Sequence, residues 1–334
     1  MKYQNILQNG KVQCAICPRN CILSEGQEGF CHVRKNINQN IELITYGYNT
    51  GLAIDPIEKK PLYHFYPNTP ILSFGTLGCN MGCLFCQNWD ISKSKENPQK
   101  MRKASPEEIV EIAKNYNCKS VAFTYNDPII FFEYAIDTAK LCRENNIKTV
   151  AVTSGFINQE PAKEFFEHMD AANIDLKGFS QRFYGKNCLA KLQPVLDTIN
   201  YAVNETACHI ELTTMLIEGE NDSTEEIQAE CDWIIKNLGD SVPIHFSAFF
   251  PRFKFLDRQP TSIKTLLKAY NIAKNLGIKY VYTGNLPHTE SSTTYCKNCG
   301  KSIIVRDGYK LLEYHLENGK CEYCSTLCDG KFCL

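Results

Sequence analysis

Three cysteines near the first quarter of the chain have the spacing of an iron-sulfur ligand set. Cys79, Cys83 and Cys86 form a CxxxCxxC motif directly after an apolar run that is typical of a β-strand. A 4Fe-4S cluster is usually held by four thiolates, one on each iron, so three local thiols leave one iron open to another ligand. A zinc site or three incidental cysteines are the competing interpretations. The aromatic Phe85 before the last cysteine and the place after a strand favour the cluster.

A second group of four cysteines lies near the N-terminus. Cys14, Cys17, Cys21 and Cys31 offer enough thiols to saturate a tetrahedral zinc ion or to close a 4Fe-4S cluster. Spacing alone does not choose between these metals. We prefer a structural metal and keep a second, auxiliary iron-sulfur cluster as the alternative.

A third group of cysteines lies near the C-terminus. Cys296, Cys299, Cys321 and Cys324 form two CxxC pairs about twenty residues apart, which predicts a zinc ribbon. Cys328 and Cys333 exceed its four ligands and are spare, redox-active or ligands of another site. Five further cysteines are scattered singly and are predicted to be small buried hydrophobic residues: Cys118, Cys142, Cys188, Cys208 and Cys231.

The segments around the central motif resemble a known family. Residues 76–90 and 55–65 are similar to the radical SAM superfamily, and specifically to its AmmeMemoRadiSam branch, which is related to pyruvate formate-lyase activating enzyme. With the terminal cysteine groups, the resemblance covers nearly the whole chain. It implies that S-adenosylmethionine (SAM) chelates the open iron, and that an electron from the reduced cluster breaks the bond from sulfur to C5′. The product is a 5′-deoxyadenosyl radical.

The resemblance also assigns side chains to the rest of the SAM site. Asn126 and Asp127 match the positions that receive the SAM amino group, although Asp127 before Pro128 is equally a helix N-cap. Thr153 and Ser154 match the segment near the ribose, with Val152 where the activating enzymes have an Asp. Phe85 is also assigned to the cofactor site.

Asp175 and Lys177 follow the next predicted strand. Lys177 resembles the lysine near the SAM carboxylate and the substrate, where a cation is chemically apt. An ion pair between Asp175 and Lys177 at the strand end is the structural alternative. Three later residues are candidates to face the substrate by position alone, and for the histidine a structural role is preferred: Thr213, His245 and Arg252. Arg252 and Lys254 stand where relatives have a more acidic stretch, so the resemblance implies nothing about the substrate.

The elements that must position these residues alternate between β-branched runs and amphipathic stretches. This pattern predicts an α/β fold, a partial (βα)6-type TIM-like barrel with small metal-stapled modules at both ends. The predicted domains are 1–68, 69–288 and 289–334. The predicted strands are 71–76, 120–124, 149–153, 172–176, 209–217, 243–249 and 279–283. The predicted helices are 106–116, 128–146, 159–168, 191–204, 223–238 and 261–276, with capping sequences at Ser105 and Ser223.

Composition limits the possible partners. The 334 residues carry 36 Lys and Arg against 37 Asp and Glu, so overall charge gives no argument for a nucleic-acid or membrane partner. The first ten residues lack the apolar core of a signal peptide, and the chain is expected to be cytoplasmic. The family resemblance implies a low-potential electron donor of the ferredoxin or flavodoxin type, and AMMECR-like and Memo-like partner proteins.

These observations predict a radical SAM enzyme that abstracts hydrogen from an unidentified substrate. Two other functions compete with it. The first is an activase that makes a glycyl radical on a partner protein. It is disfavoured because no further cysteines follow the central motif before Ser105, where activases with extra clusters insert them. The second is a non-catalytic zinc-ribbon binding protein, which the intact central motif disfavours.

Overall fold

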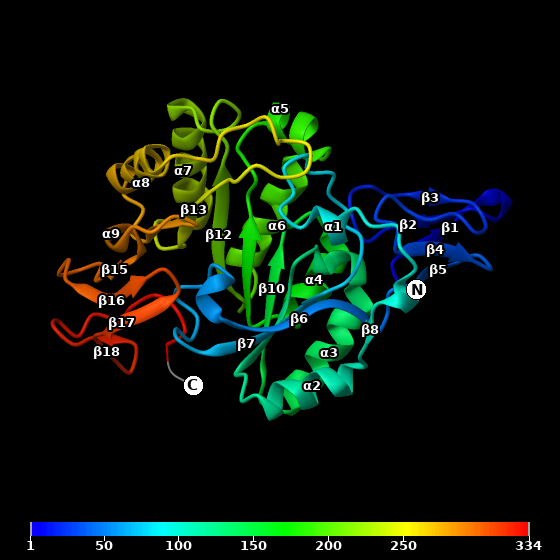
Figure 1. The fold of residues 1–334 in the computed structure, drawn as a ribbon, viewed down its shortest axis with the longest axis horizontal. Helices are drawn as coiled ribbons and strands as arrows, with labels where there is room; N and C mark the ends of the chain where they lie inside the picture. The colour runs from blue at the N-terminus through cyan, green and yellow to red at the C-terminus, as the bar shows by residue number, and fades with distance from the viewer. Residues whose placement is uncertain (1, 333–334) are drawn as a thin grey trace.

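A twisted nine-stranded sheet forms the centre of the molecule in the computed structural model, which describes residues 2–332 (Figure 1). Its strand order is β14-β13-β12-β11-β10-β9-β7-β6-β8. Seven of these strands are parallel: β7 (Pro70–Gly75), β9 (Ser120–Phe123), β10 (Lys148–Thr153), β11 (Ala171–Asp175), β12 (His209–Leu216), β13 (Ile244–Ala248) and β14 (Val281–Gly284).

Six long helices connect the parallel strands and cover the outside of the sheet. They are α2 (Pro106–Asn115), α3 (Phe132–Glu144), α4 (Gln159–Glu167), α6 (Gln193–Asn204), α7 (Thr224–Leu238) and α8 (Ile263–Leu276). The two ends of the strand order do not pair with each other, so the sheet is an open, partial barrel. The predicted α/β barrel is therefore confirmed, and all seven predicted strands and six predicted helices are present within a few residues.

Local sequence explains where these helices begin. Ser105 accepts a hydrogen bond from the backbone N–H of Glu108, whose carboxylate accepts one from the Ser105 N–H, as a capping box does. Ser223 caps α7 by accepting from the Glu226 N–H, but the Glu226 carboxylate accepts from the Phe179 N–H, so the reciprocal half of the box is absent there. The parallel strands are buried on both faces, as the neighbouring residues Val121 and Ala122 show, because helices cover one face and the barrel interior the other.

Shorter elements complete the chain around the barrel. The helical ones are η1 (Gln8–Gly10), η2 (Ile57–Lys59), α1 (Trp89–Ser92), η3 (Pro98–Lys100), η4 (Pro128–Phe131), α5 (Gln181–Phe183), the π-helical η5 (Tyr184–Cys188) and α9 (Thr289–Ser292). None of the helices among residues 2–332 combines the length and the apolar character that crossing a membrane requires.

Two strands of the sheet were not predicted. β6 (Tyr48–Pro56) pairs antiparallel with β7, and the short β8 (Arg102–Lys103) pairs with β6. The register of β6 shifts between Thr50 and Ala53, and Gly51 between them has a φ of +64°. This bulge interrupts the alternation of buried and exposed residues on which strand prediction depends.

The N-terminal residues form two small antiparallel sheets beside the barrel. Their strands are β1 (Gln4–Ile6), β2 (Val12–Cys14) and β3 (Ile22–Leu23), then β4 (Arg34–Ile37) and β5 (Asn40–Leu43). Arg34 joins them to α3 through two hydrogen bonds to Glu133, of 3.0 and 2.7 Å. Asn158 at the start of α4 donates to the carbonyls of Ala15 and Cys17, at 2.8 and 3.2 Å.

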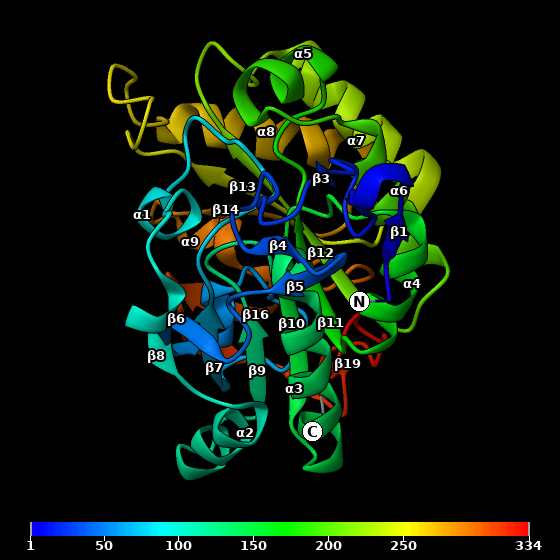
Figure 2. The same ribbon diagram turned by 90° about the vertical axis from the view of Figure 1, so that its right-hand side faces the viewer.

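The C-terminal residues form a second small unit on another side of the barrel (Figures 1 and 2). Its strands are β15 (Thr294–Tyr295), β16 (Ser302–Asp307), β17 (Lys310–Tyr314), β18 (Leu316–Glu317) and β19 (Lys320–Cys321). Arg306 on β16 is fully buried, donates to the Tyr63 carbonyl at 2.8 Å and lies 4.3 Å from the centre of the Tyr63 ring. This unit is thus anchored on the segment that connects β6 to β7.

His64 is a second anchor and makes the docking of the C-terminal unit sensitive to pH. Its Nε2 is 2.6 Å from the Tyr282 hydroxyl and its Nδ1 is 2.5 Å from the Asp329 carbonyl. Burial disfavours the imidazolium ion and lowers the pKa of His64 to about 4, although Glu211 opposes the shift. The unfolded chain therefore binds a proton between pH 6.5 and 4 that the folded chain excludes.

We expect stability to fall as the pH falls through this window. Above pH 6.5 His64 is neutral in both the folded and the unfolded chain, so its burial does not reduce the unfolding free energy. By pH 4 about 3 kcal/mol of unfolding free energy is lost. Urea unfolding of wild type and His64→Gln at pH 7.5, 5.5 and 4.5 measures this, and the variant should show the shallower pH dependence. His315→Gln, at a half-buried site of the same unit, is the control and should not make the pH dependence shallower, because hydrogen bonds to Glu313 and Glu322 raise rather than lower the pKa of His315. Equal slopes for wild type and His64→Gln would contradict the assignment.

Candidate active site at the carboxyl ends of the strands

A cavity of about 580 Å³ opens at the carboxyl ends of the parallel strands. Every parallel strand from β10 to β14 contributes lining residues, as do the loops after β7 and β9, the segment between β6 and β7 and the β16–β17 turn. Barrel enzymes place their active sites at this end because neighbouring strands bring side chains of distant sequence position together there. The predicted residues that line the cavity are Cys79, Cys83, Phe85, Cys86, Asn126, Asp127, Ser154, Asp175, Lys177, Thr213 and His245.

The loop after β7 carries the three central thiols into this cavity. The Met81 N–H donates to the Cys79 sulfur at 3.4 Å, and the Ser92 hydroxyl lies 3.1 Å from the Cys86 sulfur. Such bonds stabilise sulfur ligands and tune the metal that they bind. The donor set, three thiols on one loop facing an open cavity, fits an iron-sulfur cluster with one iron left free for another ligand.

A second segment holds the cysteine loop from outside. The N–H groups of Gly82 and Leu84 donate to the carbonyls of Cys188 and Asn187, at 2.9 and 2.8 Å. The Cys188 thiol also hydrogen-bonds to Cys83, which lowers the pKa of Cys83 to about 7. All five singly placed cysteines are buried as predicted, but Cys188 in addition touches the cysteine loop. Sequence spacing could not reveal this contact, because the two thiols are far apart along the chain.

The side chain of Asn126 forms its hydrogen bonds with the residues just before Cys79. Its amide nitrogen donates to the Thr76 hydroxyl and to the carbonyls of Leu77 and Gly78, at 3.0, 3.3 and 3.0 Å. Its amide oxygen accepts from the Thr76 N–H at 3.2 Å. One buried side chain therefore fixes the three residues before the first thiol.

Asp127 organises the turn after β10. Its carboxylate accepts hydrogen bonds from the Thr153 hydroxyl at 2.9 Å, the Ser154 N–H at 3.0 Å and the Ser154 hydroxyl. It also accepts from the Ile129 N–H at 3.1 Å, so the predicted N-cap alternative is confirmed. Both hydroxyls thus point to Asp127, but only Ser154 also lines the cavity.

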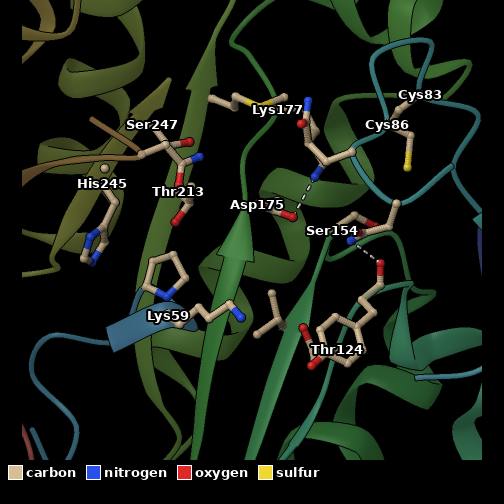
Figure 3. A pocket seen from close by; sticks show the side chains of 18 of the residues that line it. Lys59, Cys83, Cys86, Thr124, Ser154, Asp175, Lys177, Thr213, His245 and Ser247 are labelled. Atoms are coloured by element: carbon tan, nitrogen blue, oxygen red, sulfur yellow. Dashed lines mark hydrogen bonds and ion pairs between the residues drawn. The ribbon is translucent and has the colours of Figure 1, made fainter. Parts of the chain in front are cut away.

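Asp175 and Lys177 form the ion pair that was the structural alternative for them. The Lys177 Nζ lies 2.6 Å from the Asp175 carboxylate, and both side chains line the cavity. Burial lowers the pKa of Lys177, but the Asp175 carboxylate outweighs burial and raises it above its usual value. Lys177 is therefore a fixed ammonium beside the cysteine loop (Figure 3).

A buried carboxylate that sequence reasoning missed lies behind His245, which lines the opposite wall of the cavity. Glu211 on β12 accepts from His245 Nε2 at 2.7 Å, His209 Nε2 at 3.1 Å, and the N–H groups of Tyr63 and His64 at 3.0 and 2.7 Å. Burial would raise its pKa, but the two histidines hold it well below the usual value. Its partners are distant in sequence, so only its place on a fully buried strand could have indicated it.

Thr213 and His245 lie side by side in the register of β12 and β13. Figure 3 shows them with Ser247 across the cavity from Cys83 and Cys86. The Thr213 hydroxyl is buried and has no hydrogen-bond partner among the described residues. The third positional candidate, Arg252, lies outside the described cavity lining. Lys254 also lies outside it, and its N–H donates to the Leu84 carbonyl at 2.9 Å.

The segment at 55–65 also reaches the cavity. Asp55 accepts from Lys59 and Lys60 at 2.8 and 2.7 Å and from the Tyr125 hydroxyl at 3.2 Å. Burial would raise the pKa of Asp55, but the hydrogen bonds from the two lysines lower it to about 2. Lys59 and Tyr125 line the cavity, so the hydrogen bonds of Asp55 connect the end of β6 to the cavity wall.

The predicted C-terminal ligand set is gathered around one point. The sulfurs of Cys296, Cys299, Cys321 and Cys324 all lie within 4.8 Å of one another. The Cys296 and Cys324 sulfurs are 3.5 Å apart, and those of Cys299 and Cys321 are 3.8 Å apart. This set can bind a metal.

The two surplus C-terminal cysteines stand apart from this ligand set. Cys328 is buried 4.0 Å from the Tyr280 hydroxyl and does not belong to the group of four thiols. Cys333 lies outside the described residues.

The N-terminal cysteines meet at a second cavity. Cys14, Cys17, Cys21 and Cys31 all line it, together with Arg19, Arg34 and several apolar side chains. The predicted grouping of these four residues in space is thus seen in the fold.

Comparison with known proteins identifies relatives of the barrel. The family model described as Radical SAM superfamily matches residues 74–231. An uncharacterized protein of Methanocaldococcus jannaschii is 42% identical over 325 residues, which cover 97% of this chain and 96% of that protein. The pyruvate formate-lyase-activating enzyme of Clostridium pasteurianum is 26% identical over 170 residues, or 48% of this chain and 67% of that enzyme.

A solved structure shares the fold. A radical SAM methyltransferase from Sphaerobacter thermophilus superposes with a TM-score of 0.51 at 15% identity, covering 66% of this chain and 68% of that one. At this identity the similarity concerns the barrel alone.

Replacing Asn126 tests whether its hydrogen bonds position the cysteine loop. We expect Asn126→Asp to lower the iron bound at the three central thiols and to reduce unfolding free energy by about 2 kcal/mol, because a carboxylate cannot donate to the two buried carbonyls. Iron analysis after reconstitution and urea unfolding measure both. Asn115→Asp, on the exposed part of α2, is the matched control. Unchanged iron content in Asn126→Asp would show that this side chain does not position the loop.

Proposed function

The chain belongs to the radical SAM superfamily, and from this membership we propose that it cleaves SAM reductively at a 4Fe-4S cluster held by Cys79, Cys83 and Cys86. The observation that carries the proposal is the placement of these three thiols on one loop at the mouth of the barrel cavity. When bound, the cluster supplies one electron that breaks the bond from sulfur to C5′, and the resulting 5′-deoxyadenosyl radical abstracts hydrogen from the substrate.

The residues around the thiols support a binding site for SAM. The Lys177 ammonium, held by Asp175, is suited to pair with the SAM carboxylate. Ser154 offers a hydroxyl to the ribose side of the cavity, and Thr153 supports it through Asp127. Phe85 contributes an apolar surface, packed against Phe183 and Phe255 at ring distances of 5.6 and 6.0 Å.

Asn126 and Asp127 have positioning roles in this proposal. Their side-chain hydrogen bonds go to the backbone before Cys79 and to the turn after β10. They therefore shape the place for the SAM amino group through the loops that they hold.

The substrate is proposed to bind on the wall opposite the thiols. The unpartnered Thr213 hydroxyl and the His245 ring offer a donor and an acceptor there, and Glu211 fixes the orientation of His245. A polar group of the substrate that satisfies Thr213 would place the substrate across the cavity from the cysteine loop.

An activase function is the second candidate. It is favoured by the similarity to the pyruvate formate-lyase-activating enzyme of Clostridium pasteurianum, whose own name states that it activates a partner enzyme. A stable glycyl radical that forms only when a partner protein is added would distinguish it from an enzyme with a small substrate. The same relationship supports a ferredoxin- or flavodoxin-type electron donor. Membership of the AmmeMemoRadiSam branch, with its AMMECR-like and Memo-like partners, stays a prediction.

We also propose that the C-terminal thiols hold zinc. Tetrahedral zinc with Zn–S bonds of about 2.3 Å requires sulfurs about 3.8 Å apart. The two distances of 3.5 and 3.8 Å support this ion. The β16–β17 turn of the same unit brings Gly308 and Tyr309 to the cavity, so the zinc would shape one side of the site.

Anaerobic assay of SAM cleavage tests the main proposal. We expect dithionite-reduced, reconstituted wild type to release 5′-deoxyadenosine from SAM, and Cys83→Ala to release at least about 100-fold less, because a site with two thiols cannot hold the cluster. Cys118→Ala, a buried thiol far from the motif in sequence, is the control and should retain activity. Failure of wild type with a reducible cluster and added electron donor would overturn the proposal.

Zinc analysis tests the C-terminal site separately. We expect about one zinc per chain in wild type, and loss of it in Cys299→Ser because three thiols bind zinc far more weakly than four. Limited proteolysis should then cut between residues 296 and 324 faster than in wild type. Cys328→Ser, in the same unit but outside the four thiols, should keep its zinc. A wild type without zinc, or with iron in this unit, would contradict the proposal.

A further inference from the structure

The cavity among the N-terminal cysteines has the wall of a metal site larger than a single ion. Cys14 faces it from the end of β2, Cys17 and Cys21 from the loop after β2, and Cys31 from the turn before β4. The rest of its wall is mainly apolar and includes Phe30. An apolar shell of this kind keeps water from metal-bound sulfur.

The two four-cysteine groups of this chain differ in how tightly their sulfurs gather. The C-terminal sulfurs lie within 4.8 Å of one another, as a shared single ion requires. Among residues 2–332 no second group of three or more His, Cys, Asp or Glu side chains gathers in this way. The N-terminal thiols are therefore spread around a cavity, as the thiols of the Cys79 loop are. Such spacing is typical of ligands that bind different irons of one cluster.

The charges at this cavity suit an anionic cluster. Arg19 lines it and lies 3.6 Å from the centre of the Phe30 ring. The hydrogen bonds of its guanidinium go to backbone carbonyls, those of Asn80 at 2.9 Å and Leu189 at 2.5 Å, so its positive charge is not cancelled by these partners. Arg34 lines the same cavity and is held by Glu133. Nearby positive charge stabilises four thiolates and their cluster.

The N-terminal site touches the loop of the central thiols. A side chain on Gly78 would place its Cβ 2.1 Å from the Cys31 carbonyl oxygen, so the backbones before Cys79 and at Cys31 are in direct contact. Arg19 adds a hydrogen bond from the N-terminal loop to Asn80, the residue after Cys79. The two ligand loops thus form one packed unit.

We propose that Cys14, Cys17, Cys21 and Cys31 hold a second 4Fe-4S cluster that delivers electrons to the central one. A reduced ferredoxin- or flavodoxin-type donor gives one electron to this cluster and leaves one electron more oxidised. The electron then moves to the cluster of Cys79, Cys83 and Cys86, with no bond or proton changing place. The delivery role rests on the proposed SAM cleavage, whereas the identity of the metal does not.

Metal and sulfide analysis with electron paramagnetic resonance tests the identity. Two clusters and one zinc ribbon predict about eight iron, about eight sulfide and about one zinc per chain in reconstituted wild type. Dithionite should produce about two spins per chain, with signals broadened by magnetic coupling between neighbouring clusters. Cys17→Ser combined with Cys21→Ser should retain about four iron and about one spin, and SAM should still perturb that spin. Cys299→Ser is the matched control and should lose zinc and keep about eight iron.

The outcomes separate the two proposals. About four iron and about two zinc in wild type would overturn the second cluster and leave SAM cleavage standing. Eight iron without 5′-deoxyadenosine would keep the second cluster and overturn the proposed function. If the double variant kept wild-type turnover with a protein electron donor, the delivery role would be wrong. Support for that role is turnover that falls at least about tenfold with the protein donor and is restored by excess dithionite.

Discussion

The structure depends on holding three thiols rigidly while the cavity in front of them stays open. A site with a free coordination position cannot be stabilised by a fourth ligand from the chain, so the backbone that carries the thiols must be fixed by other contacts. Asn126 fixes the residues before Cys79, and the segment at Asn187 and Cys188 fixes the residues around Cys83. The thiol loop is therefore fixed by contacts on the side away from the cavity, and the side that faces the cavity remains free to bind a ligand.

Buried ionic groups connect this site to the C-terminal unit. Glu211 joins the backbone of Tyr63 and His64 to the cavity wall at His245, and Arg306 joins the C-terminal unit to the same Tyr63. Removing one member of such a network leaves the others buried and unsatisfied, which typically costs several kcal/mol. The segment between β6 and β7 thus couples the C-terminal unit to the shape of the cavity, although it contains none of the thiols.

The sequence allowed much of this arrangement to be predicted, for physical reasons that also show where prediction ends. Strands and helices of the barrel were predictable because their apolar patterns and caps, as at Ser105, are local. β6 was missed because Gly51 and a bulge break its alternation. The cysteine groups were recognisable from spacing. The partners of Glu211 and the contact of Cys188 with the thiol loop were not, since they depend on residues far apart in sequence that only the closed sheet brings together.

The two outer cysteine groups show why spacing in sequence is a weaker guide than spacing in space. Both sets offer four thiols, but a CxxC pair turns its two sulfurs toward one point, and two such knuckles in the C-terminal unit converge on a volume that fits one ion. The N-terminal thiols come from β2, from the loop that follows it and from the turn before β4, so they approach their cavity from several directions. Whether four sulfurs meet at one point therefore depends on the strands and loops that carry the cysteines. In our proposals, the same four-thiol composition therefore has a structural role at one end of the chain and a redox role at the other.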